Sequence, residues 1–174
     1  MSQLKTGNGY VGIIARHRGK ILITQRLEKP HVFNLPDGHC DGHSFGTACF
    51  INFENQTGLR VIGAPRPIVL TNPIKRTLCK DGCSSHDWRV FEVDWFGEIK
   101  FCKNKVSWIG WMSAEEMAGL SQKTETYLKR LKLAEQAEDQ TMVDVIKESL
   151  QGEWMESPGL DETWYQIFKE LKII

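Results

Sequence analysis

The sequence predicts a single domain of the α/β (α+β) class, because strand-like and helix-like segments are mixed along the chain. Two apolar runs, Tyr10–Ala15 and Ile21–Thr24, flank a polar turn and predict a β-hairpin. Asp87–Phe96 alternates apolar and polar residues from Phe91 to Trp95, as a half-buried strand does. A length of 174 residues fits one domain with room for extra elements.

Between the hairpin and the alternating strand, the sequence predicts one helix and several short strands. Ser44 is a good N-cap and Gly58 a good C-cap, so we expect a helix between them. Pro65 and Pro67 are expected to break the next region into two strands. The short strands are expected at Val32–Phe33, Arg60–Gly63, Ile68–Leu70, Ile99–Cys102 and Val106–Met112.

The last third of the chain is predicted to be helical. The sequence Ser113-Ala114-Glu115-Glu116 is a capping-box pattern and predicts a short helix to Gly119. Three further helices with apolar faces are expected at Ser121–Ala137, Thr141–Leu150 and Asp161–Ile174. The residues expected to point inward are Tyr127, Leu128, Leu131 and Ala134 in the first, Met142, Val143, Ile146 and Leu150 in the second, and Trp164, Ile167, Phe168 and Leu171 in the third.

The composition favours a cytoplasmic protein without a global charge bias. The formal net charge is zero, so no overall field favours nucleic acid or an anionic membrane, and nucleic acid is not the expected partner. No apolar run approaches the roughly 18 residues that span a bilayer, and the N-terminus lacks the apolar core of a signal peptide. Five cysteines, an odd number, argue against a complete disulfide framework.

The stretch Gly38–Leu59 reads Gly-His-Cys-Asp-Gly-His-Ser-Phe-Gly-Thr-Ala-Cys-Phe-Ile-Asn-Phe-Glu-Asn-Gln-Thr-Gly-Leu. Its loop-helix-loop frame resembles the box of the Nudix hydrolase superfamily, G-x5-E-x7-R-E-U-x-E-E-x-G-U, where U is a bulky apolar residue. The resemblance implies an α/β/α sandwich with a mixed β-sheet, so residues 1–138 are expected to form a Nudix-like domain. Residues 139–174 lie outside the resemblance, and their amphipathic pattern predicts extra C-terminal helices packed on the same domain.

The frame of the box is kept, but its acidic residues are not. The positions of the family glutamates fall on His43, Asn52, Asn55 and Gln56. A helix turns about 100° per residue, so the last three share one face. In the family that face carries carboxylates that hold magnesium, whereas amides offer neutral oxygens and cannot take up a proton. We therefore expect a degenerate box without catalytic residues.

The resemblance implies that the pocket beside the box takes a nucleotide-like or other phosphorylated ligand. The residues expected to contact it are Arg26, Gly38, His39 and Asp41. An ion pair of Arg26 with Glu28 at the surface is an equally weighted alternative. No cofactor is expected in this interpretation.

Three alternatives stay open at this point. An active hydrolase that cleaves a nucleoside diphosphate-linked substrate would need relocated Mg²⁺ or Mn²⁺ ligands, for which Asp41, Glu54 and Glu92 are candidates. A protein-binding scaffold would use the C-terminal helices, which also leaves a homodimer open. The motifs His39-Cys40-x-x-His43 and Cys79-x-x-x-Cys83-x-x-His86 contain zinc-type ligands, although neither spacing is a strong zinc signature.

Overall fold

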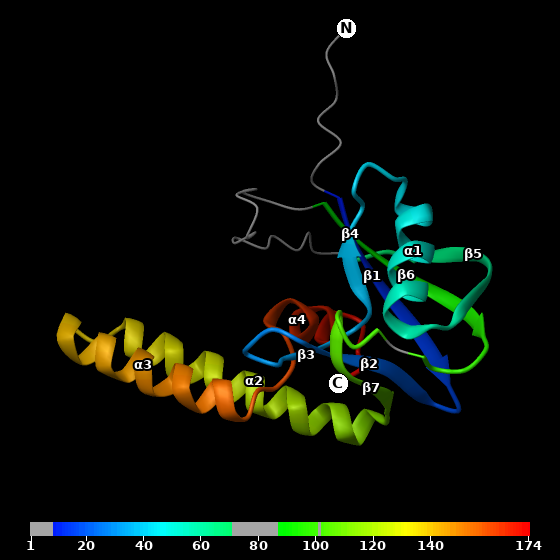
Figure 1. The fold of residues 1–174 in the computed structure, drawn as a ribbon. Coiled ribbons are helices and arrows are strands. Elements are labelled where there is room, and N and C mark those ends of the chain that lie inside the picture. The colour runs from blue at the N-terminus through cyan, green and yellow to red at the C-terminus, as the bar shows by residue number, and fades with distance from the viewer. Residues whose placement is uncertain (1–8, 71–86, 101) are drawn as a thin grey trace, which may run out of the picture.

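The computed structural model describes residues 9–70, 87–100 and 102–174, and in this part of the chain seven strands form one mixed sheet (Figure 1). The strands are β1 (Gly9–His17), β2 (Lys20–Arg26), β3 (Phe33–Asn34), β4 (Asp37–His39), β5 (Arg60–Ile68), β6 (Asp87–Phe96) and β7 (Val106–Met112). The helices are α1 (Phe45–Thr57), α2 (Ala114–Glu135), α3 (Gln140–Glu156) and α4 (Glu162–Glu170).

The sheet has two wings that share the hairpin of β1 and β2. In one wing β1 pairs with β6 in parallel and with β4 antiparallel, and β6 carries β5 on its other side. In the second wing β2 lies between β3 and β7, both antiparallel to it. The two wings meet where Arg16 pairs with Ile21 and His17 with Lys20.

The alternation of side chains along β1 builds a core on each face of the sheet. Val11 and Ile13 face the side of the sheet that α1 covers, where Phe53 is fully buried. Ile14 faces the opposite side, which α4 covers with Trp164. The result is a helix–sheet–helix sandwich, with α1 and α4 on opposite sides of the strands (Figure 1).

The position of α4 depends on a glycine in the central strand. A Cβ atom on Gly12 would lie 1.9 Å from the ring of Trp164, a distance at which two carbon atoms overlap. The missing side chain therefore creates the space that the indole fills. Trp164 and Phe168 are both completely buried, so α4 forms part of the main core.

Helices α2 and α3 form an antiparallel hairpin that extends past the sheet on one side (Figure 1). The ring of Tyr127 stacks on that of Trp154 at 4.4 Å between centroids. Arg130 forms a bidentate ion pair with Glu153 across the same interface. We call this pair of helices the α2–α3 arm.

The structure confirms the predicted sandwich, the hairpin of β1 and β2, and strands β6 and β7. It also confirms that the last helix turns Trp164, Ile167 and Phe168 inward. No helix in the described ranges combines the length and the apolar character that a membrane span requires.

Several predicted elements were wrong. Gly119 does not end a helix: α2 spans 22 residues in all and continues past it, because one interior glycine costs only about 1 kcal/mol. The prolines do not divide β5. Among the described residues this strand pairs with β6 alone, and its register shifts between Ile62 and Arg66, where an edge strand tolerates proline. Met142 is 59% exposed rather than inward. Residues 99, 100 and 102 are not in a strand, and β4 was not predicted.

Replacing Trp164 by alanine should lower the free energy of unfolding by about 3–5 kcal/mol, because a large buried aromatic side chain leaves a cavity. Urea unfolding followed by circular dichroism measures this change. Trp164→Phe, which keeps most of the volume, should cost less, and the exposed control Met142→Ala should stay within about 0.5 kcal/mol of the parent. Equal stability of Trp164→Ala and the control would contradict the central place of α4.

Candidate functional site

The site is built on helix α1, whose two ends are defined by the predicted caps. The Ser44 hydroxyl accepts a hydrogen bond from the backbone N–H of Thr47 at 3.2 Å, which satisfies a free donor of the first turn. Gly58 ends the helix in a left-handed conformation with φ of 73°. A Cβ atom at Gly58 would also come within 2.7 Å of the carbonyl oxygen of Lys100, so glycine is required here for two reasons.

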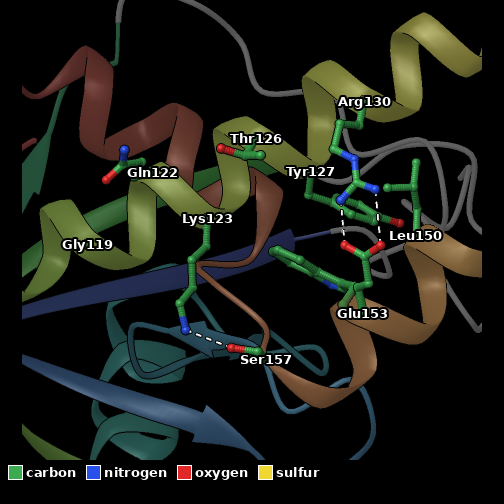
Figure 2. A pocket seen from close by; sticks show the side chains of 10 residues that line it. Gly119, Gln122, Lys123, Thr126, Tyr127, Arg130, Leu150, Glu153 and Ser157 are labelled. Atoms are coloured by element: carbon green, nitrogen blue, oxygen red, sulfur yellow. Dashed lines mark hydrogen bonds and ion pairs between the residues drawn. The ribbon is translucent and has the colours of Figure 1, made fainter.

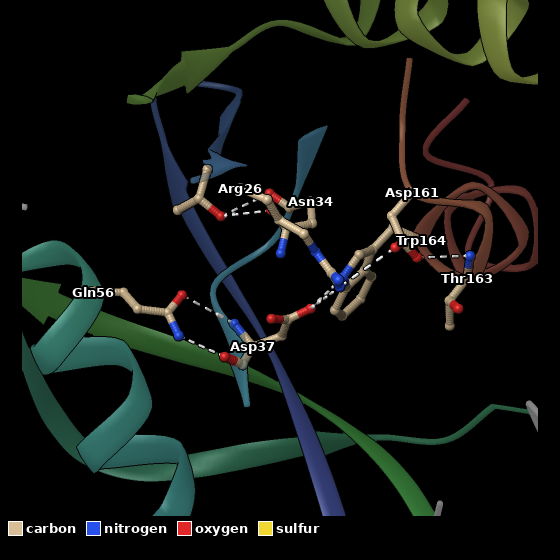
Figure 3. A network of polar contacts seen from close by, with 8 residues as sticks. Arg26, Asn34, Asp37, Gln56, Asp161, Thr163 and Trp164 are labelled. Atoms are coloured by element: carbon tan, nitrogen blue, oxygen red, sulfur yellow. Dashed lines mark hydrogen bonds and ion pairs between the residues drawn. The ribbon is translucent and has the colours of Figure 1, made fainter. Parts of the chain in front are cut away.

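Side-chain amides on α1 hold strand β4 against the helix. Gln56 Nε2 donates to the backbone carbonyl of Asp37 at 2.5 Å, and the Asp37 N–H donates back to Gln56 Oε1 at 3.4 Å (Figure 3). Asn52 Nδ2 donates to the carbonyl of His39 at 3.1 Å and to that of Ala48 at 3.0 Å. We call this set of hydrogen bonds the amide bridge.

The amide bridge depends on donors that a glutamate lacks. An ionised carboxylate only accepts hydrogen bonds, so it would face the carbonyl oxygens of β4 with like partial charge. The approach is also close: a Cβ atom on Gly38 would lie 2.1 Å from Asn52 Oδ1. Strand β4 therefore lies directly on the helix face that carries Asn52 and Gln56.

The four family positions are not gathered into one site. Asn52 and Gln56 meet at β4, whereas Asn55 and His43 are exposed. The backbone N–H of His43 donates to the Cys40 carbonyl at 2.8 Å in the turn before the helix. Magnesium prefers charged oxygen ligands, and this face offers neutral amides whose N–H groups are already bound to backbone carbonyls. The donor set present here does not fit the metal that the resemblance implies.

Behind β4, a buried ionic cluster connects the strand to helix α4 (Figure 3). Arg26 Nη2 lies 3.8 Å from Asp37 Oδ2 and 3.4 Å from Asp161 Oδ2. Trp164 Nε1 donates to Asp37 Oδ2 at 2.9 Å, and Asp161 caps α4 by accepting from the Thr163 N–H at 3.0 Å. Burial raises the pKa of the Asp37 carboxyl group, and it outweighs the opposing influence of Arg26 and the Trp164 N–H.

The predicted ligand residues Arg26, His39 and Asp41 lie in different surroundings. Arg26 is placed behind the strand, where its charge faces two carboxylates. His39 is partly buried and its ring contacts Tyr10 edge-on at 4.9 Å. Asp41 is exposed in a turn with a positive φ of 46°. Contact of these residues with a ligand stays a prediction.

The acids proposed as relocated metal ligands lie on separate surfaces. Glu54 pairs with Arg60 at 3.2 Å, while Glu92 lies 3.5 Å from Arg16 and 3.8 Å from Arg66. Arg66 also pairs with Asp94. Within residues 9–70, 87–100 and 102–174, no three His, Cys, Asp or Glu side chains are grouped as metal ligands. The motif Cys79–His86 and the basic residues Lys75, Arg76 and Lys80 lie outside the described residues.

Three aromatic rings beside β4 form a contact group that the sequence did not reveal. The ring of Trp88 lies 4.2 Å from that of Tyr10 and 5.7 Å from that of Trp164. Trp88 Nε1 and Arg26 Nη2 are buried and make no hydrogen bond. Buried polar groups are almost always hydrogen-bonded, so the Trp88 N–H is unusual, whereas Arg26 Nη2 is faced by the carboxylates of Asp37 and Asp161 at ion-pair distance. The sequence gives no sign of this, because nothing in it distinguishes Trp88 from a core tryptophan.

Comparison with known proteins supports the fold. No protein-family model and no curated protein matches the sequence. Among solved structures, a NUDIX-family hydrolase from Clostridium perfringens aligns with a TM-score of 0.52 and 16% identity, over 82% of this chain and 95% of that one. A NUDIX hydrolase from Nitrosomonas europaea aligns with a TM-score of 0.51 and 21% identity, over 64% and 76%.

A MutT NUDIX hydrolase from Burkholderia pseudomallei gives a TM-score of 0.50 and 16% identity, over 63% of this chain and 84% of that one. At these identities the similarity is one of fold. The chain has a Nudix-like fold, as the resemblance of residues 38–59 implied.

Replacing Gln56 by glutamate should destabilise the protein by about 1–3 kcal/mol at neutral pH, because the Asp37 carbonyl loses its donor and faces a carboxylate instead. Repulsion from that carbonyl should raise the pKa of the new carboxyl group in the folded state. The loss of stability relative to the parent should therefore shrink as the pH falls through this raised pKa.

Urea unfolding at a series of pH values measures the effect of Gln56→Glu. Asn55→Glu is the matched control, since Asn55 lies on the same helix but is exposed, and it should change stability by less than about 0.5 kcal/mol. If both variants are equally stable, the amide bridge does not contribute to folding.

Proposed function

We propose that this chain is a non-catalytic Nudix-fold domain that binds a nucleotide-like or other phosphorylated ligand. The observation that carries the proposal is the amide bridge. Asn52 and Gln56 use their N–H groups to hold β4 in place, and neither side chain can act as a base or supply a charged metal ligand. The helix thus keeps its shape and loses the groups that the family's reaction needs.

Two buried donors support the binding part of the proposal. Trp88 Nε1 has a polar hydrogen without an acceptor, and Arg26 Nη2 makes ion pairs but no well-aligned hydrogen bond; both lie near Trp164. Phosphate and nucleobase oxygens are acceptors of the required kind. The positive charge of Arg26 is already balanced by the carboxylates of Asp37 and Asp161. We therefore expect Arg26 to contribute to ligand affinity through a directed hydrogen bond more than through its charge.

A second candidate function is self-association through the α2–α3 arm. Leu133, in the last turn of α2, and Met142 and Val145, near the start of α3, are 67%, 59% and 62% exposed. Exposed apolar side chains that come together as a patch mark interaction surfaces. A second copy of the chain would bury them in a homodimer.

The binding proposal predicts that the purified protein releases no phosphate above background from a panel of nucleoside diphosphate-linked compounds with Mg²⁺ or Mn²⁺. Isothermal titration against the same panel should detect a ligand whose affinity is unchanged by EDTA, since no metal ligand set is required. Turnover that disappears on changing Asn52 or Gln56 would overturn the proposal.

For a ligand found in this way, Trp88→Phe should weaken binding by about two- to tenfold, because one hydrogen-bond donor is lost. Trp108→Phe is the matched control, since Trp108 lies on β7 and is 38% exposed. An equal effect of the two substitutions would place the ligand elsewhere.

Self-association predicts that Leu133→Glu with Val145→Glu converts a dimer into a monomer, because two charges would be desolvated at the interface. Light scattering after size-exclusion chromatography gives the mass. Val69→Glu, at a position that is 86% exposed on another surface, should leave the mass unchanged. A monomeric parent protein would remove this candidate.

A further inference from the structure

A groove between α2 and α3 is separate from the box helix, and none of its lining residues takes part in the ligand binding or the self-association proposed above. Its volume is about 480 Å³. Pockets for small molecules typically have about 300–1,000 Å³, so this groove is large enough for a ligand of one or two rings. All of its lining residues come from α2, α3 and the residue Ser157 that caps α3 (Figure 2).

One wall of the groove is aromatic and apolar. Tyr127 and Trp154 stack with an angle of 22° between their ring planes, and both line the space. Leu150 lies beside them and is almost completely buried. Both rings line the groove, and aromatic side chains favour contact with a flat apolar group.

The charges along the groove are not balanced. Arg130 and Glu153 face each other in a bidentate pair, with Arg130 Nη2 3.0 Å from Glu153 Oε1, so their charges cancel locally. Lys123 Nζ donates to the Ser157 hydroxyl at 2.8 Å. Among the described residues, no carboxylate lies within ion-pair distance of Lys123, so the groove has one uncompensated positive charge.

We propose that this groove binds a small organic anion, which consists of a flat apolar body and one carboxylate or phosphoryl group. The anionic group pairs with the Lys123 ammonium and accepts the hydrogen of the Ser157 hydroxyl, whose oxygen already accepts from Lys123. The apolar body lies on the Tyr127–Trp154 wall. The anionic end of the ligand thus meets the cationic end of the groove, and its apolar end meets the aromatic wall. Binding involves no covalent step.

The test uses the full chain and defined probes. 2-Naphthoate and 2-naphthyl phosphate carry the flat body with each type of anionic group, and 2-naphthalenemethanol is the neutral comparison. Isothermal titration of the parent protein should give saturable binding of at least one anion, about tenfold tighter than the neutral compound, as a charge-assisted hydrogen bond contributes. Inorganic phosphate without the apolar body should bind more weakly than either aromatic anion.

Substitutions of Lys123 locate the site. Lys123→Gln should weaken binding of the anion about tenfold and remove the preference over the neutral compound, while Lys123→Arg should retain most of the affinity. Lys132→Gln is the matched control, because Lys132 is also an exposed lysine of α2 but does not line the groove, and it should leave the affinity unchanged. Circular dichroism confirms that each variant is folded.

Two results would overturn the proposal. One is the absence of saturable binding of both aromatic anions to the parent protein. The other is binding that Lys123→Gln does not weaken more than Lys132→Gln does, which would assign the anion to another site. Neither result bears on the hydrolysis and nucleotide experiments, because those change Asn52, Gln56 and Trp88, and none of these residues lines the groove.

Discussion

Asp37 is the residue through which the two helical layers of this protein are connected. Its backbone N–H and carbonyl are bonded to Gln56 of α1 on one face of the sheet. Its carboxylate accepts the indole N–H of Trp164 from α4 on the other face, and lies opposite Arg26 at the end of β2. One short strand thereby fixes the position of both helices. The sandwich, the location of the candidate site and the burial of the ionic cluster all depend on this arrangement.

The chemistry of helix α1 follows from the difference between an amide and a carboxylate. A carboxylate next to a backbone carbonyl is repelled unless a cation lies between them, whereas an amide N–H binds the carbonyl directly. Asn52 and Gln56 make three such donations, to His39, Ala48 and Asp37. Each is worth only about 0.5–1.5 kcal/mol in net terms, but leaving the carbonyls without donors would cost more. Between α1 and β4, the Nudix-like arrangement is therefore held by hydrogen bonds that need no cation.

Local signals in the sequence were sufficient where an element is determined by its own residues. Ser44 and Gly58 define α1, and the alternation of Asp87–Phe96 defines β6. Strand β4 has only three residues and includes a glycine, so neither periodicity nor propensity identifies it. The hydrogen bond between Trp164 and Asp37 spans 127 positions, and no local pattern predicts such a pair. The box frame in the sequence indicated roughly where the candidate site lies. Its buried donors and its ionic cluster could be seen only in the structure.

The packing of Trp164 against Gly12 affects the order in which parts of the chain can fold during synthesis. The indole of Trp164 fills the space above Gly12, and it belongs to a segment synthesised long after β1. While the ribosome is still making the intervening chain, the apolar face of β1 stays without its covering helix. Non-local contacts of this kind slow folding, because the chain loses the entropy of loop closure before the contact contributes favourable free energy. During that interval the growing chain presents an apolar surface on which a chaperone can bind.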